Sequence, residues 1–404
     1  MNRNGRQLGA IFLVAGTSIG AGVIALPLVL AGIGLLLTAL CMVLVWAVMY
    51  YSSLINIELN LQAGHGMDIG QLGERYGGKW SAILGKFVLV ALMYALLAAY
   101  FHGLISMSLH LFSLPQRWLP WVTMEIFAVV YGLMSLPLRG LYQFNRLLFT
   151  AMLAIAALFI GGLCIGRFWH HAPLSEGIFL PPNSWSLRRT LPVVPILFTS
   201  FGFQVIFHTL TEYCARDRRV LRRVFFYGSL IPMCAYIVWT AAILWAVHGN
   251  DANFYGAMAE GKVQVGPLVD KLSHISSLPY AHSTVWAIAL CSVVTSIVGV
   301  GMGLCDSLRP LFRGKTLRSR PWITLVALLP PFLMAVFVPN AFTAFLGFSG
   351  IILSILAILL PLYLLRRGKF TDHNYPAVAK ISLQWLCLAV AAVVIVCEII
   401  HLLS

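Results

Sequence analysis

The first apolar segment of the chain is centred on Val14-Ala15-Gly16-Thr17-Ser18-Ile19-Gly20-Ala21-Gly22-Val23. Three of these ten residues are glycines, and each glycine inside a helix costs about 1 kcal/mol relative to alanine. A break in the helix explains this composition. Unwound backbone exposes N–H and C=O groups, which a bilayer tolerates only where they line a cavity or meet a ligand. The stretch therefore predicts a broken helix at a binding site.

A related stretch lies in the sixth apolar segment and reads Ile196-Leu197-Phe198-Thr199-Ser200-Phe201-Gly202-Phe203-Gln204-Val205. Both stretches contain Thr-Ser-x-Gly, and five predicted spans separate them. Because five is odd, the second unit enters the membrane from the opposite face, as in an inverted-topology repeat. The alternative is close helix packing through Gly16-x-x-x-Gly20. Phe198 replaces the first glycine in the second stretch, which favours the break.

The composition is that of an integral membrane protein. Of the 404 residues, 60% are hydrophobic and only 10% are charged, and the mean hydropathy is +0.88. Soluble domains have about 25% charged residues, and the continuous apolar runs exclude the alternating pattern of a β-barrel. The net charge of +14 does not indicate nucleic-acid binding, because the basic residues cluster between apolar runs. The eight cysteines form no CxxC pair, so neither disulfides nor a metal site are expected.

Eleven segments are long enough to cross a bilayer, which predicts an all-α membrane protein with a single domain over residues 1–404. Repeat one is expected over 8–167 (helices 1–5) and repeat two over 190–365 (helices 6–10), followed by an additional helix 11 over 380–402. The expected spans are 8–32, 35–60, 82–112, 118–137, 143–167, 190–213, 222–248, 281–308, 321–338, 341–365 and 380–402.

The distribution of basic residues predicts the orientation. Of the 27 Lys and Arg residues, all but Arg117, Arg167, Arg188, Arg189, Lys262 and Lys271 fall on the side of the N-terminus. By the positive-inside rule, the N-terminus is expected in the cytoplasm and the C-terminus in the periplasm. The first apolar run is too long for a signal peptide and is expected to stay as an uncleaved helix.

The two breaks are the predicted substrate site. The N–H groups at the start of a half-helix suit a carboxylate, and the carbonyl ends suit an ammonium group or a cation. Tyr100 is favoured over Tyr94 as a hydroxyl that faces the substrate, because Ala98, Ala99 and Gly103 leave room beside it. The predicted substrate-binding residues are Gly16, Thr17, Ser18, Ile19, Gly20, Ala21 and Gly22, then Tyr100, and then Phe198, Thr199, Ser200, Phe201 and Gly202.

Several blocks of the chain resemble the hydroxy and aromatic amino acid permeases of bacteria. The blocks are Thr17-Ser18-Ile19-Gly20-Ala21-Gly22 with Pro27, Met93-Tyr94-Ala95, Ala98-Ala99-Tyr100, Phe144-Asn145-Arg146, Phe198 to Phe203, Thr295-Ser296 with Gly299-Val300, and Gly303-Leu304-x-Asp306. The chain most resembles the tyrosine-specific permeases. The resemblance implies a five-plus-five inverted-repeat fold, an inner-membrane location and proton-coupled uptake of tyrosine, tryptophan or phenylalanine.

The chain departs from that family at two positions. Met152 stands where relatives commonly have a lysine in the fifth helix, and Gln204 stands where tyrosine permeases tend to have histidine. The resemblance also places Thr295 and Ser296 beside the unwound carbonyls near Ala15 to Gly20. Hydroxyl oxygens suit a small cation, so sodium coupling is the alternative to proton coupling, and Thr295, Ser296 and Met152 are the predicted ion-coupling residues.

Acids and histidines inside membrane segments are functional candidates because burying charge there is costly. Glu58 and Asp306 are interpreted as gate residues that pair with loop arginines. The other candidates are Glu125, Glu212 and Glu398 among the acids and His102 and His208 among the histidines, whereas His170-His171 is interpreted as a solvated turn.

An enzyme and a channel are the competing functional classes. No P-loop or HExxH motif occurs in the sequence, and no charged ring is visible. We therefore expect a transporter without a cofactor. Its expected partners are an aromatic amino acid, a coupling proton or sodium ion, and membrane lipid.

Overall fold

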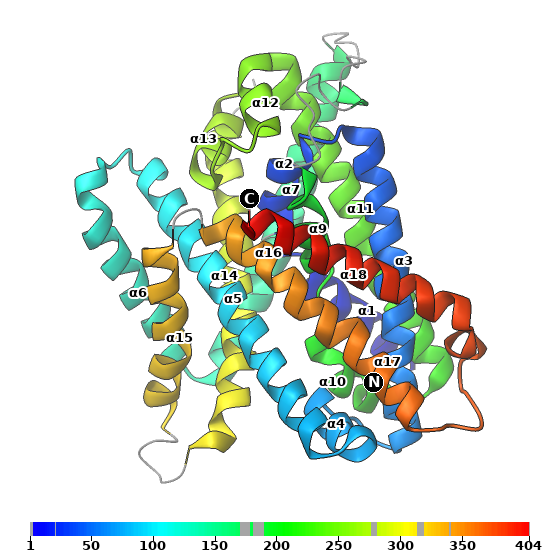
Figure 1. The fold of residues 1–404 in the computed structure, drawn as a ribbon. Coiled ribbons are helices and arrows are strands. Elements are labelled where there is room, and N and C mark those ends of the chain that lie inside the picture. Colours follow the sequence, from blue (N-terminus) through cyan, green and yellow to red (C-terminus); the bar gives the residue numbers. More distant parts are fainter. Residues whose placement is uncertain are drawn as a thin grey trace.

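A computed structural model describes residues 3–20, 22–169, 178–180, 190–275, 281–312, 319–338 and 341–403. Within these ranges the chain forms helices and no strands (Figure 1). The fold is therefore all-α, as the sequence predicts.

The first span is broken where the glycines predict. Helix α1 covers Arg3–Ser18 and helix α2 covers Gly22–Leu30. The two halves are bent by 51°. This bend confirms the predicted break, and of the residues assigned to it only Ala21 lies outside the described part of the chain.

The sixth span is broken at the second copy of the Thr-Ser-x-Gly motif. Helix α9 covers Val193–Ser200, the short helix η3 covers Gln204–Ile206, and α10 covers Phe207–Tyr213. Residues 201–203 between them are not helical. The break lies directly after Thr199-Ser200, which confirms the prediction that both copies interrupt a helix.

The remaining helices vary in length from 3 to 33 residues. They are α3 (Leu35–Ala63), α4 (Ile69–Gly77), α5 (Lys79–Leu111), η1 (Gln116–Trp118), α6 (Leu119–Ser135), α7 (Leu138–Trp169), α11 (Arg218–Asn250), α12 (Ala252–Ala259), α13 (Val265–Ile275), α14 (Ala281–Leu308), η4 (Arg309–Leu311), α15 (Arg320–Phe337), α16 (Ala341–Ser354), the π-helix η5 (Ile355–Leu359), α17 (Leu360–Arg367), η6 (Pro376–Ala379) and α18 (Ile381–Leu403).

In the described ranges, eight helices are long and apolar enough to cross a membrane, or nine if α1 and α2 form one bent span. The predicted fourth span corresponds to α6, which has only 17 residues. The predicted sixth span is divided between α9 and α10. A multi-pass membrane protein is thus confirmed, and the count of eleven crossings stays a prediction.

Three short helices were not predicted. Asp68 and Gln71 form a reciprocal capping box that starts α4. Asp251 caps α12 and forms a 2.5 Å ion pair with Lys271 of α13. The hydrogen bond from Lys271 lowers the pKa of the Asp251 carboxyl. The acids of the 249–280 stretch therefore stabilise its local structure.

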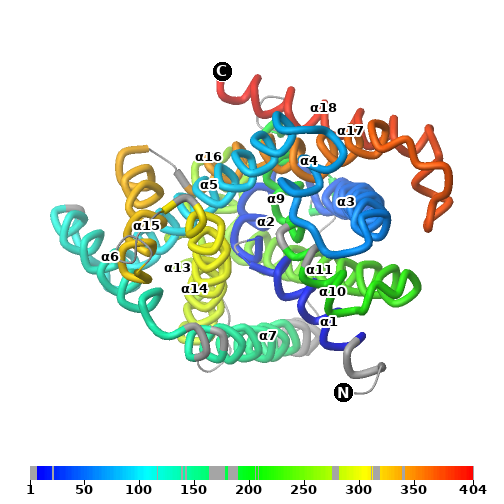
Figure 2. The backbone as a smooth tube through the Cα atoms, turned by 90° about the horizontal axis from the view of Figure 1, so that it is seen from below, coloured from blue at the N-terminus to red at the C-terminus, as the bar shows by residue number. Residues whose placement is uncertain are grey.

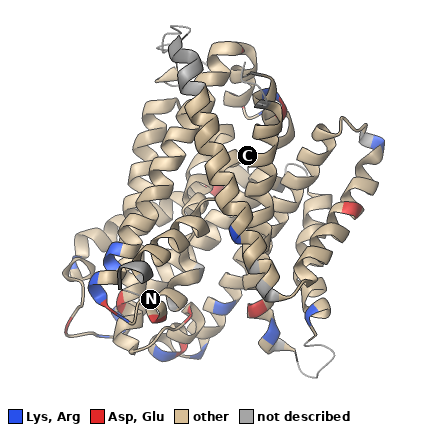
Figure 3. Cartoon of the chain, turned by 180° about the vertical axis from the view of Figure 1, so that it is seen from behind, with Lys and Arg blue, Asp and Glu red and all other residues tan. Residues whose placement is uncertain are grey.

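The broken helices lie inside the bundle. Figure 2 shows α2 and α9 near its centre, with α3, α5, α11 and α14 around them. Helix α1 packs along α11, where a Cβ on Gly228 would lie 2.6 Å from that of Val14. A larger residue at Gly228 would push α1 away. Lys and Arg gather at the end of the molecule where the N-terminus lies (Figure 3), which agrees with the predicted charge asymmetry.

Candidate functional site

The two helix breaks meet at the centre of the bundle. Helix α2 packs against α9. A Cβ added to Gly22, at the start of α2, would lie 3.1 Å from the Cβ of Ser200 at the end of α9. The close approach requires a residue without a side chain at position 22. The repeated motif therefore brings two distant parts of the sequence into contact.

Tyr236 of α11 joins the two breaks. Its hydroxyl donates a 2.7 Å hydrogen bond to the carbonyl of Ser18, at the end of α1. Its ring meets the ring of Phe201 edge to face, with centroids 5.8 Å apart. The side chain is fully buried. Sequence reasoning missed this residue, because the seventh segment carries no motif that distinguishes it among the 14 tyrosines.

Side chains from neighbouring helices satisfy the backbone carbonyls around the first break. Ser292 of α14 donates to the Gly20 carbonyl at 2.7 Å, and the indole N–H of Trp239 donates to the Val23 carbonyl at 2.6 Å. With the bond from Tyr236, three side chains replace the lost helical partners. This arrangement explains how an interrupted helix is stable in an apolar interior.

Tyr100 reaches the same junction. Its hydroxyl lies close to Ser296 of α14, whose Oγ lies only 2.5 Å from where a Cβ on Gly20 would stand. The hydroxyl of Tyr94 instead donates to the carbonyl of Val326 on α15. Of the two tyrosines, Tyr100 is the one beside the break, in agreement with the preference from sequence.

The serine and threonine hydroxyls of the motif bond to backbone carbonyls one turn earlier. Thr17 and Ser18 donate to Leu13 and Val14, and Ser200 donates to Ile196. Thr199 donates both to Pro195 and, at 2.9 Å, to Leu346 of α16, so it ties α9 to a neighbouring helix. Local backbone bonding thus occupies all four hydroxyls, and their role toward a substrate stays a prediction.

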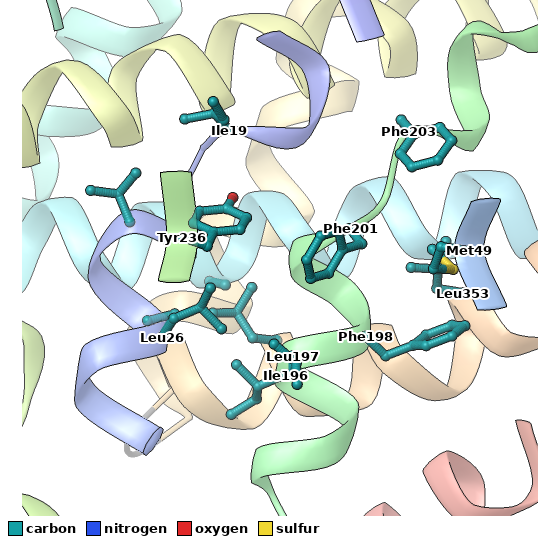
Figure 4. Close-up of a cluster of buried hydrophobic side chains, with 14 of the residues drawn as sticks. Ile19, Leu26, Met49, Ile196, Leu197, Phe198, Phe201, Phe203, Tyr236 and Leu353 are labelled. Carbon is teal, nitrogen blue, oxygen red and sulfur yellow. The ribbon is translucent and has the colours of Figure 1, made fainter. Parts of the chain in front are cut away.

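Two other predicted site residues pack around the first break. A Cβ on Gly16 would lie 3.1 Å from the ring of Phe149, so this glycine allows α7 to approach α1. Ile19 is buried in the cluster shown in Figure 4. In the second break, a Cβ on Gly202 would lie 3.1 Å from the carbonyl oxygen of Thr199.

The three phenylalanines of the sixth span point in different directions. Phe201 faces Tyr236, whereas Phe198 lies beside Met49 and Leu353 (Figure 4). Phe203 packs against Phe207, with ring centroids 6.0 Å apart. Phe201 is therefore the phenylalanine that lies at the junction of the breaks, and the other two pack in the surrounding core.

Gln204 follows this cluster and is buried. Its Nε2 contacts the sulfur of Met49 at 3.6 Å. Its Oε1 has no hydrogen-bond partner among the described residues. This orphaned acceptor belongs to one of the two residues interpreted from the sequence as departures from the family that the chain resembles.

The predicted ion-coupling residues are only partly together. Ser296 lies beside Gly20, but Thr295 donates to carbonyls of its own helix, at 2.8 Å to Cys291. Ser292 is the residue of α14 that bonds an unwound carbonyl. Met152 is buried on α7, one turn from the Phe149 ring that contacts Gly16.

The interpretation of Glu58 as a gate paired with loop arginines is corrected. Its buried carboxylate accepts hydrogen bonds from the backbone N–H groups of Asn374 and Tyr375, at 3.0 and 3.1 Å, and from Gln62 at 2.8 Å. Glu58 therefore anchors the segment that precedes α18. Asp306 does lie near an arginine, 3.9 Å from Arg309, and both side chains are exposed.

The remaining acids have varied surroundings. Glu212 accepts a 2.6 Å hydrogen bond from the backbone of Gly66, and Glu125 is exposed on α6. Glu398 is fully buried beside Gly347, and neither carboxyl oxygen has a hydrogen-bond partner among the described residues. None of these contacts involves a residue at the junction of the breaks.

The histidines lie apart from the breaks or outside the described part of the chain. His102 contacts the carbonyl of Ala335 on α15 at 3.3 Å. His170-His171 and the side chain of His208 lie outside the described residues.

The junction is closed in this structure. Tyr100, Phe201 and Tyr236 are all buried, with at most 7% of the side chain of each exposed. A ligand between the breaks would require these side chains to separate.

Comparison with known proteins yields a consistent set of relatives. Residues 3–401 match the tryptophan/tyrosine permease family. Tyrosine-specific transport system 1 of Haemophilus influenzae is 30% identical over 92% of this chain and 90% of its own length. The tryptophan-specific transport protein of Pseudomonas aeruginosa is 26% identical over 91% of this chain and 88% of its own.

A solved structure supports the fold. The crystal structure of MhsT in complex with L-phenylalanine aligns with a TM-score of 0.59 and 14% identity, covering 97% of this chain and 98% of MhsT. At that identity the likeness concerns the fold alone.

Proposed function

The chain belongs to the tryptophan/tyrosine permease family, whose members are transporters and not enzymes, and we propose that it imports an aromatic amino acid, with tyrosine the first choice and tryptophan or phenylalanine next. The observation that carries this proposal is the meeting of two helix breaks beside Tyr100, Phe201 and Tyr236. This junction combines backbone groups for a charged amino acid with aromatic side chains for its ring.

Each part of the substrate has a matching group at the junction. The carboxylate is assigned to the backbone N–H groups at the start of α2, near Gly20 and Gly22, where the helix dipole favours negative charge. The ammonium group is assigned to the carbonyl end of α1. The aromatic ring is assigned to a position between Phe201 and Tyr236 once these two side chains separate, because aromatic rings bind one another edge to face.

Transport in reconstituted vesicles tests the proposal. We expect saturable uptake of labelled tyrosine, competition by tryptophan and phenylalanine, and counterflow when unlabelled substrate is placed inside. Uptake without saturation or counterflow would indicate a channel. No competition by any aromatic amino acid would contradict the proposed substrate class.

Replacing Tyr100 by phenylalanine should weaken tyrosine transport more than phenylalanine transport. In the proposed site the Tyr100 hydroxyl faces the hydroxyl of bound tyrosine. Its removal leaves that substrate hydroxyl unpaired, and an unpaired buried polar group costs about 1–3 kcal/mol. This cost corresponds to roughly a 5- to 150-fold loss of affinity. The ratio of the two apparent KM values measures the effect.

Tyr94→Phe is the matched control, because its hydroxyl bonds the carbonyl of Val326 away from the junction. It should leave the ratio of KM values unchanged. Equal effects of Tyr100→Phe on both substrates would remove Tyr100 from this role.

We propose proton symport, with sodium symport as the alternative. Met152 has no ionisable proton, so a proton needs another carrier. Asp306 and His102 are candidates, whereas the carboxylate oxygens of Glu58 are engaged by the segment before α18. Glu398 joins the candidates because its buried carboxyl has no hydrogen-bond partner among the described residues.

The coupling ion is tested by uptake at fixed pH with and without a sodium gradient. We expect sodium-independent uptake in the native protein and in Thr295→Ala, because a proton needs no hydroxyl ligands. Sodium dependence that disappears in Met152→Lys would contradict proton coupling. It would indicate that the missing lysine leaves a cation site open beside Gly20 and Ser296.

A further inference from the structure

A groove of about 880 Å³ lies between α3, the start of α11 and the segment 373–377, away from the helix breaks. Its volume is within the range of small-molecule sites. Four arginines line one wall, namely Arg218, Arg219, Arg222 and Arg223. Their i, i+4 spacing places them on adjoining turns of one helix face. The groove is thus strongly basic on one side.

The positive charge of this wall is not neutralised within the described residues. All four arginines are exposed, and none forms an ion pair with a described acid. Asp217 precedes them, but its carboxylate caps α11 through the backbone N–H groups of Arg219 and Val220. Glu58 is buried beneath the segment it anchors. The groove therefore has guanidinium groups available for an external anion.

An aromatic cluster adjoins the arginines, and two of its members, Tyr50 and Phe226, also line the groove. Trp46 stacks on Tyr50 with centroids 6.2 Å apart, and Phe226 meets both rings edge to face at 5.7 and 5.3 Å. Aromatic residues of this kind gather at the boundary between lipid headgroups and hydrocarbon. One turn separates Phe226 from Arg222, which places the arginines at the level of the headgroups.

Beyond the aromatic cluster, both helices present apolar side chains outward. Tyr227, Ile231 and Val238 are exposed along one face of α11. On α3 the exposed side chains include Leu40 and Val43. The indole N–H of Trp46 donates to Ser229, so the two helices lie side by side here. The basic groove thus continues into an apolar surface long enough for acyl chains.

We propose that this groove binds the headgroup of an anionic diacyl phospholipid. Arginine suits this role because its planar guanidinium binds phosphate oxygens through two hydrogen bonds. The apolar surface next to the groove suits the acyl chains, which a free phosphate does not have. Bound lipid would connect α11 with the segment before α18, whose Tyr375 hydroxyl already bonds the carbonyl of Arg218 at 2.7 Å.

The test uses full-length protein purified in neutral detergent. Phosphatidylglycerol, phosphatidylcholine or inorganic phosphate is added. Bound lipid is counted by native mass spectrometry, and the melting temperature of the protein is measured separately. We expect phosphatidylglycerol to bind at least tenfold more tightly than phosphatidylcholine and to raise the melting temperature. The preference for phosphatidylglycerol over phosphatidylcholine should fall as salt increases, because ions screen exposed charges.

The double variant Arg222→Gln/Arg223→Gln should lose the preference, and Arg222→Lys/Arg223→Lys should keep part of it. The control Arg75→Gln/Lys79→Gln removes two exposed charges outside the groove and should behave like the native protein. A preference that is absent, insensitive to salt, or unchanged in Arg222→Gln/Arg223→Gln would overturn the proposal. Full competition by inorganic phosphate would also overturn it, because the groove would then be a site for a free anion. If the glutamine variant does not fold, the test rests on the native protein. Its preference for phosphatidylglycerol over phosphatidylcholine should then fall as salt increases, and an unchanged preference would contradict the proposal.

Discussion

Gly20→Leu should abolish uptake while the protein still folds and reaches the membrane. A Cβ at this position would lie 2.5 Å from Ser296 Oγ, so a leucine would force the Ser296 side chain aside. It would also fill the approach to the N–H groups at the start of α2, where the substrate carboxylate is assigned. We expect no uptake above background, measured with labelled tyrosine in vesicles that contain equal amounts of protein.

Gly132→Leu is the matched control, because a Cβ at Gly132 meets nothing within 4 Å. It should transport normally. A second test uses the smaller change Gly20→Ala, which should also reduce uptake. The double variant Gly20→Ala/Ser296→Gly should recover part of that uptake. Normal uptake by well-expressed Gly20→Leu would contradict the assignment of the carboxylate to this break.

Glu58→Ala should strongly destabilise the protein. The substitution leaves the backbone N–H groups of Asn374 and Tyr375 without their acceptor. A buried donor without a partner costs about 1–3 kcal/mol, so two such groups cost roughly 2–6 kcal/mol of unfolding free energy. The melting temperature in detergent should therefore fall well below that of the native protein.

Glu58→Gln keeps one acceptor oxygen. Its melting temperature should therefore lie between those of the native protein and Glu58→Ala. Glu74→Ala is the control, because Glu74 is an exposed acid on the short helix α4. It should leave the melting temperature unchanged. If Glu58→Ala melted at the native temperature, Glu58 would not be the anchor of the segment before α18.

The fold class and the helix breaks are predictable from local features. Long apolar runs indicate membrane helices because the bilayer cannot hydrogen-bond to exposed backbone. Three glycines between Val14 and Val23, and a matching Thr-Ser-x-Gly motif after Ile196, indicate interrupted helices. In the structure both helices are interrupted at these places. The number of crossings was harder to predict, because α6 and the divided sixth span are shorter than a standard membrane helix.

The partners of these features were not predictable. Tyr236, Trp239 and Ser292 satisfy the carbonyls of the first break from helices more than 200 residues away in sequence. None of the three belongs to a recognisable motif. Glu58 shows the same limit, because two of its partners are backbone groups more than 300 residues away, which leave no trace in side-chain patterns.

The sequence alone therefore determined that this protein is a helical membrane protein, where two of its helices are interrupted, and which family it resembles. These properties depend on composition and on residues close together in the chain. The tertiary structure alone decided which side chains close the breaks, that Phe201 and not Phe198 faces Tyr236, and that Glu58 anchors a loop. The reason is that these contacts depend on how helices distant in sequence rotate and pack, which no local pattern encodes.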